Sequence, residues 1–531
     1  MSDQGQGVLH LYSSTTAPLL VNEEVNNDAK DDDVSAGEQH SLQSHCQAFR
    51  PSLSEVIEEV KQLYAIALPM IITGLLIYGK SAISMFFMGK LGKETLAGGS
   101  LSIGIANITG YSLISGLAMG MEAISSQACG ARQWHLMGQT LQRTIVILIL
   151  ASFPISVLWL NMEPILLFCH QDPAISSVAS TYLALSLPDL LFQCLINPLK
   201  IYLRTQNITL PLMLSAAFAF ALHAPINYIL VYHLSLGIQG IALAVALTDL
   251  NLIVALLFYL RFSGVCDKTW QGWSLECLNE WKPILSLAIP NCMSVCLEWW
   301  WYELMVLLSG LLTNASDAVA TMGILIQATS LIYIFPSSLS LSVSARVGNE
   351  LGANRPSKAK TSSMVGLWCA VFSSFMAMTF MITMRNAWGK IFTNDKAILS
   401  LTAMVMPVAG LCELANYPQT TGCGVLRGSA RPNLGAHINL GSFYGFGLPV
   451  AIAMGFYKDV GLLGLWLGLL AAQVMCAIIM IVVVARTDWL AQAKRAEQLT
   501  GSNGEGEGEG EGEEVEEESR TQGLISVMVE N

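Results

Sequence analysis

Carboxylates that interrupt long apolar stretches are the residues of this sequence best suited to chemistry. The run Cys296-Leu-Glu-Trp-Trp-Trp-Tyr-Glu303 sets two glutamates among aromatic residues, and Glu413 interrupts another apolar run. A charged side chain at the centre of a bilayer costs at least about 2.5–3.5 kcal/mol. A buried carboxyl group avoids much of that cost by holding a proton. We therefore interpret Glu298, Glu303 and Glu413 as candidate proton carriers.

Helical geometry separates the two glutamates of this run. Five residues correspond to about 140° around a helix, so Glu298 and Glu303 do not face the same point. Glu298 shares a face with Trp301 and Tyr302 at i+3 and i+4. A carboxylate beside aromatic rings suits an organic substrate, which makes Trp301 and Tyr302 candidates for a substrate cleft.

Lys80 lies within another apolar run, where a cation is costly. The segment Gly74-Leu-Leu-Ile-Tyr-Gly-Lys-Ser81 fits the phosphate-loop formula, but that loop works only between a strand and a helix. We therefore reject nucleotide binding. Lys80 could snorkel, pair with a carboxylate or bind substrate. The alternative for the acids within apolar runs is that they pair with Lys80 or stabilise contacts between helices; these acids are Glu298, Glu303, Glu413, Asp189 and Asp249.

Uncharged polar residues within apolar runs complete the set of cleft candidates: Asn227, Asn291 and Gln327. They could line a cavity with Lys80, or they could equally serve as hydrogen bonds between helices.

The composition excludes several classes of protein. The chain has 531 residues, of which 53% are hydrophobic and 12% charged, where a soluble domain carries about 25% charged residues. The net charge of −12 is concentrated in acidic segments near the termini, such as Gly504 to Glu518. There is no basic face for nucleic acid, no nucleophile–base motif and no metal-ligand spacing among the 12 cysteines. We expect a membrane protein that is not an enzyme and needs no metal or cofactor.

The apolar runs predict twelve membrane helices between two polar tails, since a span needs about 20 apolar residues. They lie at residues 63–87, 96–120, 139–160, 175–198, 208–231, 238–260, 283–309, 318–342, 362–384, 398–420, 433–455 and 461–485.

The predicted organisation has five parts. They are a disordered cytosolic tail (1–54), a first lobe of six helices (55–265), an inter-lobe loop (266–282), a second lobe of six helices (283–488) and a disordered acidic cytosolic tail (489–531). With both tails in the cytosol, eighteen Lys and Arg residues flank the helices on the cytosolic side and six on the other, as the positive-inside rule requires.

The two lobes are expected to be copies of one unit. Pro69 and Pro290 lie 221 residues apart, and Pro225 and Pro449 lie 224 apart. Six helices per copy give both copies the same orientation in the membrane. Parallel repeats of this kind place a substrate cavity at their interface.

The chain resembles the multidrug and toxic compound extrusion (MATE) transporters, and within them the plant DETOXIFICATION branch. The resemblance covers about residues 55–490. It is carried by the Glu-Trp-Trp-Trp run above, by Ser344-Ala-Arg-Val-Gly-Asn-Glu-Leu-Gly-Ala353 and by Gln419-Thr-Thr-Gly-Cys-Gly-Val-Leu-Arg-Gly428.

The resemblance implies an all-α membrane fold in which two pseudo-symmetric six-helix lobes form a V around a cleft. It also implies export of organic compounds in exchange for protons or sodium. At the family's coupling positions this sequence has Glu298 and Glu413, and Glu303 also matches the motif. Ser84 stands where many bacterial members have an aspartate, which favours coupling in the second lobe.

These observations lead to one hypothesis and its alternatives. The chain would export a plant hormone or secondary metabolite from the cytosol by proton antiport, as a monomer in the plasma membrane or the vacuolar or late endosomal membrane. The alternatives are a sodium-driven or uncoupled carrier, and a scaffold or regulator that acts through its tails.

Overall fold

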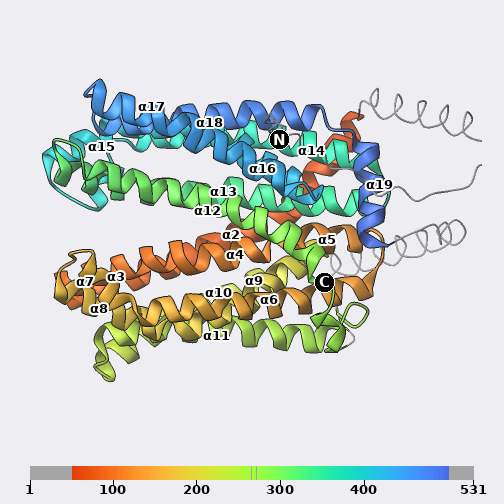
Figure 1. Cartoon of the computed structure of the whole chain (residues 1–531), viewed down its shortest axis with the longest axis horizontal. Helices are drawn as coiled ribbons and strands as arrows, with labels where there is room; N and C mark the ends of the chain where they lie inside the picture. The colour runs from red at the N-terminus through yellow and green to blue at the C-terminus, as the bar shows by residue number, and fades with distance from the viewer. Residues whose placement is uncertain (1–50, 265, 271, 502–531) are drawn as a thin grey trace, which may run out of the picture. The chain divides into compact units, whose positions relative to one another are not determined.

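Helices make up the architecture of residues 51–264, 266–270 and 272–501, which the computed structural model describes (Figure 1). These described residues contain no strand. Residues 1–50 of the predicted N-terminal tail (1–54) and residues 502–531 of the predicted C-terminal tail lie outside them, and α2 begins at Leu53, within the predicted N-terminal tail. The all-α fold class is thereby confirmed.

The first lobe contains the helices before residue 264. They are α2 (Leu53–Leu91), α3 (Lys93–Ala106), η1 (Asn107–Tyr111), α4 (Ser112–Ala118), α5 (Gly120–Gly130), α6 (Trp134–Leu160), α7 (Met162–Phe168), α8 (Pro173–Leu185), α9 (Leu187–Thr205), α10 (Leu210–Tyr228), η2 (Ile229–His233) and α11 (Gly237–Ser263).

The second lobe follows a loop that holds the short helix η3 (Leu275–Leu278). Its helices are α12 (Trp281–Ser309), α13 (Ala315–Gly352), α14 (Pro356–Met384), η4 (Trp388–Ile391), α15 (Lys396–Gly428), α16 (Pro432–Asn439), η5 (Leu440–Gly447), α17 (Leu448–Ile452), η6 (Ala453–Tyr457) and α18 (Leu462–Ala485), followed by α19 (Trp489–Thr500).

Each of the twelve predicted spans coincides with helix in the structure. Within the described residues, ten helical stretches are long and apolar enough to cross a membrane, and the α8–α9 pair, bent by 46°, makes an eleventh. The remaining predicted span, 283–309, coincides with α12, which is 29 residues long and contains Asn291, Glu298 and Glu303.

Backbone geometry repeats between the lobes as the sequence predicted. Left-handed backbone angles recur at Arg132 and Asn354, at Asn207 and Ala430, and at Ser235 and Asp459. The offsets of these pairs are 222, 223 and 224 residues. The π-helical segment η2 likewise recurs 224 residues later as η6. The two lobes thus share the same backbone conformation at these matched turns.

Each lobe has its own apolar core. One large cluster of buried side chains lies entirely between Met70 and Cys266. The other, apart from Leu63, lies between Trp301 and Ala496. Figure 1 shows the corresponding groups of helices, with α10 and α11 in one and α15 and α18 in the other.

The two lobes meet most closely at one end of the helices, which we call the tail end because α2 begins and α18 ends there. A Cβ added to Gly352 of α13 would lie 1.9 Å from the carbonyl oxygen of Gln127 in α5. The Gln127 side-chain amide donates to the carbonyl of Gly428 at 3.0 Å, and Asn349 donates to the carbonyl of Thr205 at 3.1 Å. Backbone therefore contacts backbone across the lobes at this end.

The residues after α18 differ from the predicted tail. Asp488 caps a further helix, α19, whose Trp489, Ala493 and Ala496 are buried. This helix packs on α13 and α14 of the second lobe and on α5 of the first. Its apolar side chains recur at helical spacing in a stretch too short and polar to read as a span. The C-terminal tail therefore starts no earlier than residue 501, rather than at 489.

We expect Gly352→Ala to destabilise the tail end. The new methyl group meets backbone that cannot rotate away, and overpacking of this kind costs about 1–3 kcal/mol. Gly104→Ala is the matched control, because nothing lies within 4 Å of a Cβ at that helical position. Thermal unfolding of the purified variants should show a lower melting temperature for Gly352→Ala only. Equal melting temperatures would contradict the close contact.

Candidate functional site

Glu298 and Glu413 lie midway along α12 and α15, far from the ends of both helices. Glu413 is buried, and its Oε2 accepts a hydrogen bond from the side chain of Asn416 at 2.9 Å. Glu298 is partly buried. The two carboxyl groups are close enough to interact electrostatically. The structure thus brings together two of the three predicted proton carriers.

No lysine or arginine among the described residues lies within 4.0 Å of either carboxylate. Besides Glu413, Glu298 interacts with the Arg427 guanidinium group at longer range and with the Tyr333 hydroxyl. Tyr302 interacts electrostatically with both acids. The pair is therefore surrounded mainly by phenol and amide groups rather than by permanent cations.

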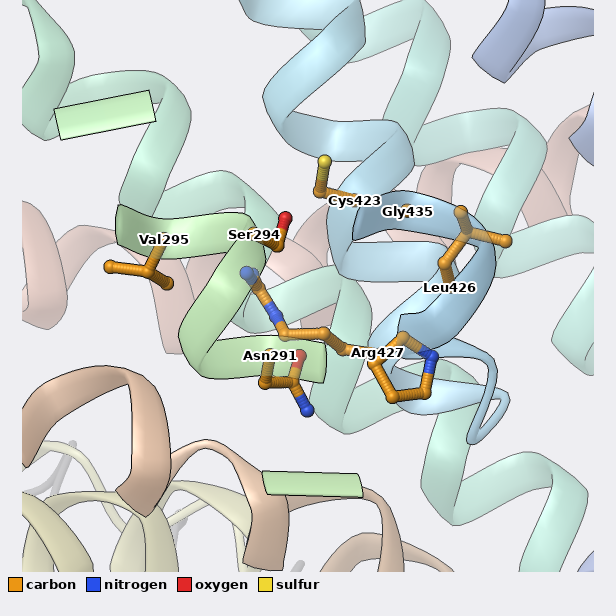
Figure 2. Close-up of a pocket in the computed structure, with 8 residues that line it drawn as sticks. Asn291, Ser294, Val295, Cys423, Leu426, Arg427 and Gly435 are labelled. Atoms are coloured by element: carbon orange, nitrogen blue, oxygen red, sulfur yellow. The ribbon is translucent and has the colours of Figure 1, made fainter. Parts of the chain in front are cut away.

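Arg427 reaches from α15 toward α12, where Ser294 and Asn291 lie beside its guanidinium group (Figure 2). These residues line a small cavity of about 10 Å³, close to the volume that one water molecule needs. The guanidinium group donates to Ser340 at 2.8 Å and lies 3.7 Å from Glu122 of the first lobe. Arg427 therefore links the surroundings of Glu298 to the contact between the lobes.

Two further predicted residues of α12, Trp301 and Glu303, do not belong to the pair formed by Glu298 and Glu413. Trp301 is 1% exposed and packs edge-on against Phe443 and Tyr444, so it belongs to the core of the second lobe. Glu303 is partly buried, and no interaction joins it to Glu298 or Glu413. The 140° separation expected around the helix is consistent with this placement.

A second polar cluster lies in the first lobe. The Lys80 ammonium group donates to Asp249 Oδ1 at 2.6 Å, and Gln193 donates to Asp249 Oδ2 at 2.8 Å. The Tyr111 hydroxyl donates to Asp189 Oδ2 at 2.6 Å. Lys80 therefore pairs with an acid, which was one of the possibilities left open by the sequence.

This cluster borders a cavity of about 280 Å³, which Trp299 of α12 also lines. A second cavity of about 200 Å³ adjoins it, because Ile77, Ser115 and Asn197 line both. The second cavity lies between the lobes, with α9 on one side and α13 on the other. Together they fall within the range of about 300–1,000 Å³ typical of ligand sites.

The remaining predicted cleft residues make hydrogen bonds between or within helices. Asn291 donates to the carbonyl of Met119 in the other lobe at 3.3 Å. Gln327 is exposed and accepts from the Tyr78 hydroxyl at 3.3 Å. Asn227 is buried and donates to His223. None of these three lines either of the two larger cavities.

His223 joins Ser84 to Thr248 through its two ring nitrogens, at 3.0 and 2.7 Å. Ser84 occupies the position at which bacterial relatives were expected to have an aspartate. The His223 side chain thus joins three helices of the first lobe through hydrogen bonds to hydroxyl groups.

Several residues of these sites were not predicted. Tyr111, Gln193 and Tyr333 contact the acids, and Trp299 rather than Trp301 lines the large cavity. Tyrosine and glutamine in apolar runs were visible in the sequence, but only their placement shows which acid each one faces.

We expect the Lys80–Asp249 pair to be strongly coupled in stability. Removal of one partner of a buried ion pair leaves an uncompensated charge and costs about 3–5 kcal/mol. Lys80→Met should therefore lower the melting temperature, and adding Asp249→Asn should recover much of the loss. Lys61→Met serves as the control, since Lys61 and Glu58 form an exposed pair that is worth at most about 1 kcal/mol. Additive effects of the two changes would show that the pair is not coupled.

Comparison with known proteins agrees with this architecture. The MatE family model matches residues 69–229 and again 290–453, one match in each lobe. The chain is 57% identical to Protein DETOXIFICATION 48 of Arabidopsis thaliana over 450 residues, which are 85% of each chain. It is 56% identical to Protein DETOXIFICATION 49 of the same plant over 448 residues, 84% of this chain and 89% of the other.

Solved structures show the same fold. The crystal structure of the eukaryotic MATE transporter AtDTX14 superposes with a TM-score of 0.81 at 29% identity, over 84% of this chain and 100% of that one. A mutant of the Vibrio cholerae MATE transporter VcmN gives 0.74 at 16% identity, over 84% and 99%. The chain therefore belongs to the MatE family and is a membrane transporter, not an enzyme.

Proposed function

We propose that this transporter exports small organic compounds from the cytosol in exchange for protons, with Glu298 and Glu413 as the coupling residues. The observation that carries this proposal is the pair of mid-helix carboxyl groups without a cation partner. Such groups change the charge of their surroundings by a full unit when they gain or lose a proton. In an apolar setting that change is energetically large.

The helices that carry the two acids are suited to bending. Pro290 lies in α12, and Pro407 and Pro418 lie in α15. Each proline removes one backbone hydrogen bond from its helix and allows a local bend. α12 also packs against α4 and α5 of the first lobe, so a change in its tilt is transmitted across the contact between lobes.

The driving force is sufficient for transport against a gradient. One proton moving through 100 mV yields about 2.3 kcal/mol, and one pH unit adds about 1.4 kcal/mol. Their sum sustains a substrate gradient of several hundred-fold, because about 1.4 kcal/mol corresponds to a factor of ten.

The orientation and location are part of the proposal. The excess of Lys and Arg at the tail end supports a cytosolic position for both termini. A monomer in the plasma membrane, or in the vacuolar or late endosomal membrane, suits the export of a hormone or secondary metabolite.

We expect Glu298→Gln and Glu413→Gln each to abolish transport driven by a pH gradient. Liposomes containing the full chain would first be screened with labelled organic compounds, and the best substrate would then be used for all variants. Glu58→Gln is the control, because Glu58 is exposed and pairs only with Lys61. Glu303→Gln should retain transport, since Glu303 does not contact the pair.

Full pH-driven transport by both glutamine variants would overturn the coupling site. Transport that follows a sodium gradient, or that needs no ion gradient, would replace proton antiport with one of the alternative carriers. A chain ending at residue 501 that keeps transport would exclude a function that depends on the C-terminal tail.

A further inference from the structure

Lys200 differs from the other cations of the bundle. Among the lysines and arginines of the described residues that are at least partly buried, all but Lys200 have a hydrogen-bond or ion-pair partner. Asp189 and Asp249 are the acids that interact with Lys200 electrostatically, and neither lies within 4.0 Å of it. The ammonium group of Lys200 thus has no direct hydrogen-bond or ion-pair partner among the described residues.

The position of Lys200 makes this lack of a partner significant. It lies in α9, five residues before the helix ends at Thr205, and it lines the cavity of about 200 Å³ between the lobes. An unpaired charge within a membrane-spanning bundle is costly. A cation kept open to a cavity can be compensated by an anionic group that enters the cavity.

Two cations line this cavity, and they differ in their partners. Arg204 forms an ion pair with Glu122 at 3.1 Å, whereas Lys200 has no ion-pair partner among the described residues. At the other end of the joined cavities Lys80 is neutralised by Asp249. Asp249 forms its ion pair with Lys80, and the Asp189 carboxyl group accepts a hydrogen bond from the Tyr111 hydroxyl, so neither acid is in direct contact with Lys200.

The rest of the lining is mainly apolar. Met70, Ile77, Ile201, Ile334 and Leu341 contribute side chains to the wall of the cavity. A ligand that fits this surface has an apolar body and a single anionic head.

We propose that Lys200 binds the carboxylate of an organic acid in the cavity between the lobes, so that the transported compounds include amphipathic organic anions. This inference rests on the proposed function, since it names the class of substrate carried. It concerns the first lobe, whereas the proposed proton site lies in the second, so the two can be tested separately.

The test uses three naphthalene compounds with the same ring system: 1-naphthylacetate, 1-naphthylacetamide and 1-naphthylmethylamine. Their binding to the purified full chain in nanodiscs would be measured by equilibrium dialysis at neutral pH, without any gradient. We expect the carboxylate to bind about tenfold more tightly than the neutral amide or the cationic amine.

Two variants of Lys200 test whether the preference for the carboxylate depends on this side chain. Lys200→Met should lower affinity for the carboxylate about tenfold and leave the amide unchanged, and Lys200→Arg should retain most of the preference because it keeps the charge. Lys61→Met, which removes an exposed lysine, should have no effect. Melting temperatures would verify that each variant is folded.

Three results would overturn the inference: tightest binding of the amine, no binding of the carboxylate to the unaltered chain, or a carboxylate preference that survives in Lys200→Met. If pH-driven transport of another compound persists in that case, the proposed function stands and only the substrate class fails. If Glu298→Gln and Glu413→Gln keep transport while binding of the carboxylate depends on Lys200, the proton site fails and the anion site stands.

Discussion

Compensation of charge inside an apolar bundle is the constraint on which the rest of this structure depends. A charge surrounded by helices and lipid needs an opposite charge, a set of hydrogen bonds or a proton. Arg204 has Glu122, Lys80 has Asp249, and Arg346 has Glu59 in a two-point contact at 3.1 and 2.9 Å. These ion pairs stabilise the fold. Glu298, Glu413 and Lys200 lack an ion-pair partner within 4.0 Å, and for that reason we propose them as the groups that exchange protons or bind ligand.

The same pairs also join the lobes. Glu59 of α2 contacts Arg346 of α13 and Ser362 of α14, and Glu122 of α5 lies between Arg204 of its own lobe and Arg427 of the other. Together with the glycine contact at Gly352, they hold the tail end closed in this structure. Because Arg427 also interacts with Glu298, the contact between lobes and the proposed proton site share one side chain. An arrangement that opens the tail end must give each of these charges another partner or expose it to water.

The sequence predicted the helices well because long apolar runs are a strong signal, and all twelve predicted spans coincide with helix. It missed α19, since a twelve-residue helix that is polar overall has no such run. It was harder to predict from the sequence which polar side chains contact each other between helices. Lys80 and Asp249 are 169 residues apart in the chain, and only the packing of α2 on α11 shows that they meet. Likewise, the run of three tryptophans indicated an aromatic site. Which tryptophan lines the cavity depends on the rotation of α12 about its axis: Trp299 lines it, whereas Trp301 is buried in the core.

The left-handed turns have a consequence for the origin of the chain. At three matched positions the two lobes adopt the same unusual backbone angle with different residues: arginine and asparagine, asparagine and alanine, serine and aspartate. Only some of these residue types favour that angle by themselves, so the path of the chain has persisted where the side chains diverged. Separate origins would require each coincidence to arise independently, whereas duplication of one ancestral gene explains them all.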